Sequence, residues 1–165
     1  MPQEMKHQDA LRMAVETEKG LVCYYRRAAE LVSDEGAKKV FTRLAKDKEE
    51  HAGQFFRHYQ GHDMGTLEDF INRPCTLNAD ALKELKGLSD PQVKDRRARE
   101  IAMEKEKQLE TSLRNTAKQI VNPVVRIIFE QMAKETGHHY EIIESEYART
   151  MRMVHESDMN TYVRE

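Results

Sequence analysis

The sequence is poor in turn-forming residues and contains no tryptophan. Its 165 residues include only seven glycines and four prolines, whereas a sandwich or barrel needs many short strands with a turn after each. Charged residues make up 34% of the chain, and its abundant glutamate, lysine, arginine, alanine and methionine favour helices. The length fits one domain with its own core. The composition therefore predicts long helices joined by few loops.

Signals for several other classes of protein are also missing. No apolar run approaches the roughly 20 residues that span a bilayer, and the opening residues, MPQEMKHQDALRM, lack the apolar stretch of a signal peptide. The net charge is −2 with both signs interspersed, so no basic face or tail indicates nucleic-acid binding. We therefore expect no membrane partner, no nucleic-acid partner and a cytoplasmic location.

The two cysteines, Cys23 and Cys75, lie far apart in the sequence. They do not form the closely spaced pair of a redox or zinc motif. Because disulfides are rare in the cytosol, we expect no disulfide here. Cys23 lies within a predicted helix, where a small buried residue is its simplest role.

Apolar residues at three- and four-residue steps predict four long helices. They cover residues 7–32, 37–59, 90–120 and 123–155. The short turn SDEG at 33–36 makes the first two helices antiparallel neighbours. Residues 61–89 form a long crossover with two short helical segments, and residues 156–165 form a loose tail. The expected fold is a single all-α domain over residues 1–165, an antiparallel four-helix bundle of two hairpins joined by a crossover, which is the ferritin-like class.

An internal repeat supports this arrangement. Residues 12–30 match residues 100–118, and residues 41–51 match residues 129–139. The offset is the same in both helices of the hairpin (106 − 18 = 88 and 139 − 51 = 88). Since a constant offset across a turn is hard to obtain by chance, we expect a pseudo-two-fold axis to relate the two hairpins.

Polar residues interrupt the apolar row of every long helix near the middle of the bundle. These residues are Glu18, Lys48, His51, Glu106, Thr136 and His139. Burying carboxylates costs several kcal/mol per ion unless something compensates. Two interpretations are open. Glu18, His51, Glu106 and His139 form a metal site of two carboxylates and two imidazoles, or Lys48 pairs with a glutamate in a metal-free polar layer.

At these residues the chain resembles the rubrerythrin-like branch of the ferritin-like proteins. The matching segments are AVETEKGLVCYYRRAAEL and VFTRLAKDKEEHAGQFF, with AMEKEKQLETSLRNTAKQI and IFEQMAKETGHHYEII as a second copy. The resemblance implies a carboxylate-bridged di-iron site and chemistry on peroxide or oxygen. Glu18 and Glu106 match the glutamates of each first helix, and His51 and His139 match the histidines of each Glu-x-x-His motif.

The chain departs from the family pattern at two positions. Lys48 and Thr136 stand where the motif has the glutamates that are expected to bridge the metals, and a lysine ammonium repels cations. Asp47 and Glu135, one residue earlier, are secondary ligand candidates. Whether Lys48 enters the site or extends out of it along the helix is open.

We expect first a rubrerythrin-like metalloprotein with an altered site, of the peroxidase type of oxidoreductase. Its cofactor would be iron, as a pair or a single ion, with manganese or zinc as alternatives. Full rubrerythrins also carry a rubredoxin-type iron site with paired cysteine motifs, which this chain lacks, so a separate electron donor would be needed. The alternative is a metal-free bundle that acts as a structural or interaction module. In both cases we expect a homodimer.

Overall fold

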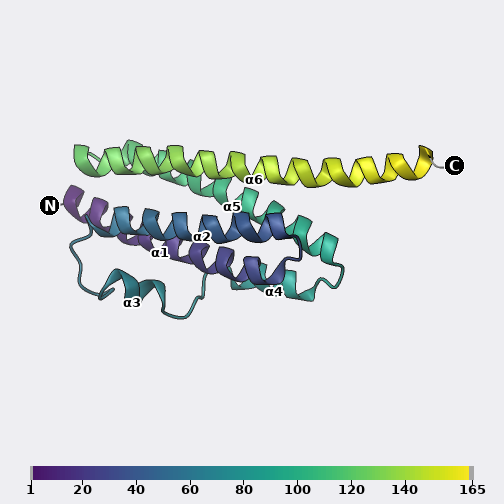
Figure 1. Ribbon diagram of the computed structural model, residues 1–165. Coiled ribbons are helices and arrows are strands. Elements are labelled where there is room, and N and C mark those ends of the chain that lie inside the picture. The colour runs from purple at the N-terminus through teal and green to yellow at the C-terminus, as the bar shows by residue number, and fades with distance from the viewer. Residues whose placement is uncertain (1, 164–165) are drawn as a thin grey trace.

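The computed structural model describes the backbone of residues 2–163 and the side-chain surroundings of residues 6–152. The described residues form helices and connecting loops and contain no strand, which confirms the predicted all-α class. Four of these helices are long and two short helices lie on the crossover; in Figure 1 the long helices run lengthwise across the view. The elements are α1 (Pro2–Leu31), α2 (Glu35–Phe56), α3 (Leu67–Ile71), α4 (Ala79–Gly87), α5 (Pro91–Gln119) and α6 (Pro123–Val163). None of the described helices is long and apolar enough to cross a membrane.

Short capped turns join the helices of each hairpin. Between α1 and α2, the Asp34 side chain accepts a hydrogen bond from the Ala37 amide at 2.9 Å, which satisfies a free donor at the start of α2. Before α5, Asp90 caps the helix and Pro91 occupies its first turn. Asn122 does the same for α6, accepting from the Val124 amide at 3.0 Å. The two short turns, at residues 32–34 and 120–122, leave α1 packed against α2 and α5 packed against α6.

Helix α6 extends further than expected. The predicted loose tail at 156–165 is wrong for residues 156–163, because α6 continues to Val163; residues 164 and 165 lie outside the described residues. After Gly137 the sequence contains neither glycine nor proline, so nothing in it interrupts the helix. Figure 1 shows this end of α6 projecting beyond the other helices.

The predicted inner rows form the core. Leu11, Tyr25, Phe41, Phe55 and Phe129 are each at most 1% exposed. The hairpins are joined across this core by the Tyr24 hydroxyl of α1, which donates to the Ala98 carbonyl of α5 at 2.8 Å. Together these contacts hold the polar positions of the four long helices in one layer.

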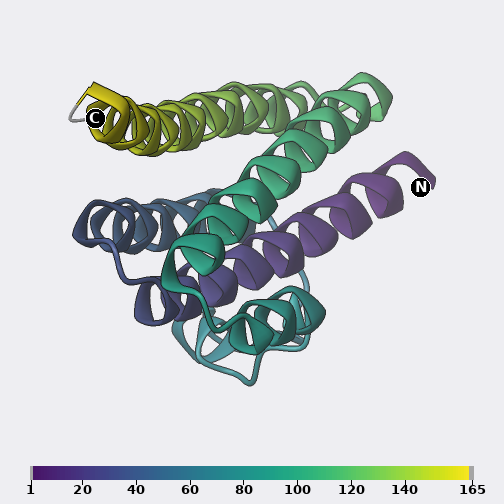
Figure 2. The ribbon, with the colours of Figure 1, turned by 90° about the vertical axis from the view of Figure 1, so that its right-hand side faces the viewer.

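The crossover returns along the outside of α1. Figure 2 shows α4 next to α1 and α5, on the side away from α6. Gly20 permits this close approach, because a Cβ at this position would lie 2.9 Å from the Cβ of Leu77. Asn78, in the left-handed backbone region at φ 67°, donates its amide to the Gly20 carbonyl at 2.9 Å.

The crossover also brings the two cysteines together, so the expectation of no disulfide is wrong. Cys23 and Cys75 form a disulfide, with their Cα atoms 6.2 Å apart. The cysteines are 52 residues apart in the sequence, and their pairing could not be predicted because it depends on the crossover folding back to place Cys75 beside α1. Closing a loop of this length stabilises the fold by about 4 kcal/mol in the chain-entropy description.

Candidate functional site: a buried lysine between two carboxylates

All six polar residues of the inner rows lie inside the bundle. Their exposed fractions range from 0% to 6%, for Glu18, Lys48, Glu106 and Thr136 at 0%, His51 at 5% and His139 at 6%. The prediction that they occupy core positions is confirmed. The question about Lys48 is also answered, since its side chain points into the bundle.

Lys48 lies between the two first-helix glutamates. Its Nζ atom donates to Oε2 of Glu106 at 3.0 Å and lies 3.5 Å from Oε2 of Glu18. The hydroxyl of Tyr25 donates to the other oxygen of Glu106 at 2.6 Å. Glu106 therefore has a donor on each oxygen, one an ammonium and one a phenol. Both donors come from the first hairpin and their acceptor from the second.

The two histidines connect the hairpins on the other side of the layer. Nε2 of His51 lies 2.8 Å from a Glu135 oxygen, and Nε2 of His139 lies 3.3 Å from an Asp47 oxygen. The imidazole rings stack with their centroids 5.0 Å apart. Each histidine thus meets a carboxylate of the opposite hairpin, as the pseudo-two-fold requires. The secondary candidates Asp47 and Glu135 therefore orient the histidines from outside the layer.

Burial and the nearby ammonium keep both imidazoles neutral. Burial first and Lys48 second lower the pKa of His51 to about 3 and that of His139 to about 2. With each Nε2 beside a carboxylate, the proton of the neutral ring belongs on Nε2. Both Nδ1 atoms are then acceptors that face the interior.

Several of these interior acceptors lack a hydrogen-bond donor. Among the described side chains, both oxygens of Glu18 and Nδ1 of His51 and His139 are buried without one. Nδ1 of His51 lies 4.0 Å from Oε2 of Glu18. The layer is thus rich in acceptors, and Lys48 is the cation placed among them.

The charges of the layer are coupled. Burial raises the pKa of Glu18 to about 7, against the opposing effect of Lys48. Burial alone would lower the pKa of Lys48, but the carboxylates of Glu18 and Glu106 raise it. Lys48 is therefore held in its charged form. The negative charge on Glu18 is the one that the layer stabilises least.

These residues do not fit a di-iron centre. Among the residues whose side chains are described, no three His, Cys, Asp or Glu groups are arranged to hold a metal ion. The Lys48 ammonium occupies the space between Glu18 and Glu106, where a cation would bind, and repels a second cation. Thr136, in the other bridging position, donates its hydroxyl to the Met132 carbonyl of its own helix at 2.7 Å and supplies no ligand to the layer.

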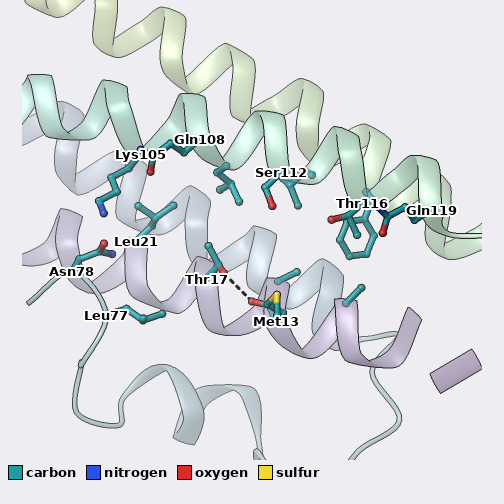
Figure 3. A pocket seen from close by; sticks show the side chains of 15 residues that line it. Met13, Thr17, Leu21, Leu77, Asn78, Lys105, Gln108, Ser112, Thr116 and Gln119 are labelled. Atoms are coloured by element: carbon teal, nitrogen blue, oxygen red, sulfur yellow. Dashed lines mark hydrogen bonds between the residues drawn. The ribbon is translucent and has the colours of Figure 1, made fainter. Parts of the chain in front are cut away.

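A groove of about 460 Å³ opens between α1 and α5 beside the layer. Figure 3 shows Met13 and Thr17 on one side of it and Gln108 and Ser112 on the other. Its apolar lining includes Leu21 and Leu109, whereas neither Glu18 nor Glu106 lines it. Apolar side chains therefore separate the charged residues from this groove.

Tyr25 was not among the predicted site residues, although its hydroxyl donates to Glu106. A signal was present in the repeat, because Tyr25 lies seven residues after Glu18 while its counterpart, Leu113, has no polar atom in its side chain. A tyrosine replacing an aliphatic residue on the same face as a buried carboxylate indicates a hydroxyl partner for it.

Comparison with known proteins agrees with the repeat and the fold. The family model described as Rubrerythrin matches residues 9–147, which include all of α2 and α5 and most of α1. The chain has no significant match among the curated proteins or the solved structures. Since the family match covers most of its length, the chain belongs to the rubrerythrin family.

Proposed function

We propose that this protein is a metal-free member of its family, in which Lys48 replaces the metal ions as the cation of the core. Its role is then that of a structural or interaction module. One observation carries the proposal: the Lys48 ammonium lies 3.0 Å from Glu106 and 3.5 Å from Glu18. Lys48 stands where the family motif has a bridging glutamate, and its ammonium contacts the two glutamates that are kept.

The charge balance supports this assignment. Two buried carboxylates need compensation, because burying an ion without a partner costs several kcal/mol. Lys48 supplies one positive charge and Tyr25 supplies a neutral donor to Glu106. The remaining negative charge rests on Glu18, whose raised pKa allows a proton to neutralise it. This balance requires no metal.

A second candidate function is a metal-binding protein that acts on peroxide or oxygen. The observation that favours it is the set of unpartnered acceptors on Glu18, His51 and His139. The carboxylates beside each Nε2 also resemble those that accept a hydrogen bond from a metal-bound histidine and orient its ring. In this alternative a single ion would be held on the Glu18–His51 side, away from the contact between Lys48 and Glu106.

Metal analysis separates the two candidates. Protein purified without a metal-affinity tag is analysed for iron, manganese and zinc and melted with and without each ion. We expect much less than one metal per chain and no change in melting temperature. Because a ligand at 100 times its Kd stabilises the folded state by about 2.7 kcal/mol, binding would be readily seen. A stoichiometric metal that is lost in His51→Ala would overturn the proposal.

A gain-of-binding variant sharpens this test. Lys48→Glu combined with Thr136→Glu restores both motif glutamates, so we expect it to bind metal and melt at a higher temperature when metal is present. The matched control is Lys46→Glu combined with Thr136→Glu. It makes the same change in charge at an exposed lysine of α2 and should bind none while Lys48 remains.

A further inference from the structure

The disulfide lies at an open surface. Cys23 and Cys75 line a hollow of about 300 Å³ together with Glu16, Lys19 and Phe70. The two cysteines differ in accessibility, since Cys23 is 7% exposed whereas Cys75, on the crossover, is exposed. A small molecule or an external thiol therefore reaches Cys75 more easily than Cys23.

Two cationic side chains, Lys19 and Arg73, lie near this disulfide, and the acidic Glu16 lines the same hollow. Lys19 precedes Cys23 by one helical turn, which places both side chains on one face of α1. Its Nζ atom donates to the carbonyl of Pro74, the residue before Cys75, at 3.3 Å, and lies 4.8 Å from the centre of the Phe70 ring. The Arg73 guanidinium lies 5.5 Å from the same ring. Cations next to a cysteine stabilise its thiolate, the form that reacts with disulfides and peroxides.

We propose that Cys23 and Cys75 are a redox-active pair, which an external dithiol reduces and a hydroperoxide reoxidises. In the reduction, a thiolate of the dithiol attacks Sγ of Cys75 and Cys23 leaves as a thiolate. The second thiol of the reductant then attacks the mixed disulfide and releases Cys75. The dithiol becomes a cyclic disulfide, and its two protons and two electrons pass to the cysteines.

The reoxidation uses the same difference in accessibility. The Cys75 thiolate attacks an oxygen of the hydroperoxide, the O–O bond breaks, and the leaving oxygen takes a proton to become water or an alcohol. Cys75 is then a sulfenic acid. The Cys23 thiolate attacks its sulfur and, with one proton, releases water. Overall, two thiols and one hydroperoxide give one disulfide, one water and one alcohol, or two waters from hydrogen peroxide.

The position of Cys75 suits this chemistry. The crossover is also held to α1 by the hydrogen bonds of Lys19 to Pro74 and of Asn78 to Gly20. These contacts do not involve the sulfur atoms, so we expect them to keep both thiols close enough to reform the disulfide after it opens.

The experiment uses the full-length folded chain in buffer with EDTA, so that bound metal cannot contribute. The protein is treated with dithiothreitol, freed of reductant, and given one equivalent of hydrogen peroxide; thiols are then alkylated and counted by mass spectrometry. We expect reduction within minutes without denaturant, followed by recovery of the intramolecular disulfide. In Cys23→Ser, a dimedone adduct should accumulate on Cys75.

The role of positive charge is tested with Lys19→Gln, which should slow the reaction of Cys75 with peroxide about fivefold to tenfold, in line with loss of a thiolate-stabilising charge. The control is Lys118→Gln, at an exposed lysine at the end of α5, which should react like the unchanged chain. The proposal is overturned if the disulfide resists dithiothreitol until the protein is unfolded. It is also overturned if the reduced pair reacts with peroxide no faster than free cysteine. Neither result depends on Lys48, so the metal-free proposal stands or fails separately.

Discussion

The two hairpins share a scaffold but differ in the chemistry at their centres. The first contributes Lys48 and Tyr25 to the buried layer, whereas the corresponding positions in the second are Thr136 and Leu113. The glutamate and histidine of each half are kept, and each histidine meets a carboxylate from the other half. The difference is therefore confined to the two donors to Glu106, both of which come from the first hairpin.

This asymmetry determines which glutamate is stabilised. Both donors of the first hairpin converge on Glu106 of the second, while Glu18 keeps only the longer contact with Lys48. The comparison shows that a cation supplied by the first hairpin contacts the glutamates of both hairpins, but does so unequally. It predicts that the two glutamates respond differently when a donor or a charge is removed.

The largest effect is expected from removing the cation. Lys48→Met keeps the length of the side chain but leaves two carboxylates in the core without an ammonium, so we expect a loss of about 3–5 kcal/mol in the free energy of unfolding. The measurement is denaturant unfolding followed by circular dichroism. Lys46→Met, at an exposed position two residues away, is the control and should change stability by less than about 0.5 kcal/mol. Equal stability of the two variants would contradict the central role of Lys48.

A smaller effect is expected from the charge on Glu18. Burial raises its pKa to about 7 from an ordinary value of 4.5, with Lys48 opposing the shift and Glu106 and Glu135 adding to it. Because the folded state binds this proton more tightly, its stabilising contribution is complete below about pH 4.5 and is lost as the pH rises to about 7. A shift of this size corresponds to about 3 kcal/mol.

Glu18→Gln isolates this contribution. The stability of the unchanged chain minus that of Glu18→Gln should fall by about 3 kcal/mol between pH 4.5 and pH 7 and stay constant above that range. Urea titrations at several pH values measure it. Glu106→Gln makes the same change in the other half, where it removes the negative charge and one of the two oxygens that accept from Tyr25 and Lys48. If Glu18→Gln has the same pH profile as the unchanged chain, the pKa of Glu18 is the same in the folded and unfolded states and the asymmetry is wrong.

The fold and the buried layer could be predicted from the sequence because both depend on periodicity. Three- and four-residue steps identify a helical face, and the constant offset of the repeat places Glu18 opposite Glu106 in the bundle. Asn122 before Pro123 marked the start of α6 for the same local reason. The end of α6 was not predictable in this way, since the absence of a helix breaker does not show how far a helix continues.

The features that sequence reasoning missed depend on contacts between distant segments. The disulfide requires the crossover to fold back over α1, which is decided by the packing of Leu77 and Asn78 against Gly20. The orientation of Lys48 depends on where the opposite carboxylates lie, so the sequence alone left it open. Asp47 and Glu135 were predicted as secondary ligand candidates, but their pairing with the histidine of the opposite hairpin depends on the geometry between the hairpins.

The smallest predicted effect tests the second donor of the first hairpin. Tyr25→Phe removes the hydroxyl that donates to Glu106 and changes little else in the packing, so we expect a loss of about 2 kcal/mol, within the range for hydrogen bonds to charged groups. The neighbouring Tyr24 is a matched control, because its hydroxyl is equally buried but donates to the neutral carbonyl of Ala98. Tyr24→Phe should therefore cost about 1 kcal/mol.

The same pair of variants, made together with Lys48→Met, shows whether the two donors act on one acceptor. Once the ammonium is gone, Tyr25 is the remaining donor to Glu106, so the cost of Tyr25→Phe should rise above its value in the unchanged chain. The cost of Tyr24→Phe should stay the same, because its carbonyl acceptor receives nothing from Lys48. Additive losses for Tyr25 and Lys48 would mean that the two donors do not act on Glu106 together. The contrast between the hairpins would then depend on the single substitution at position 48.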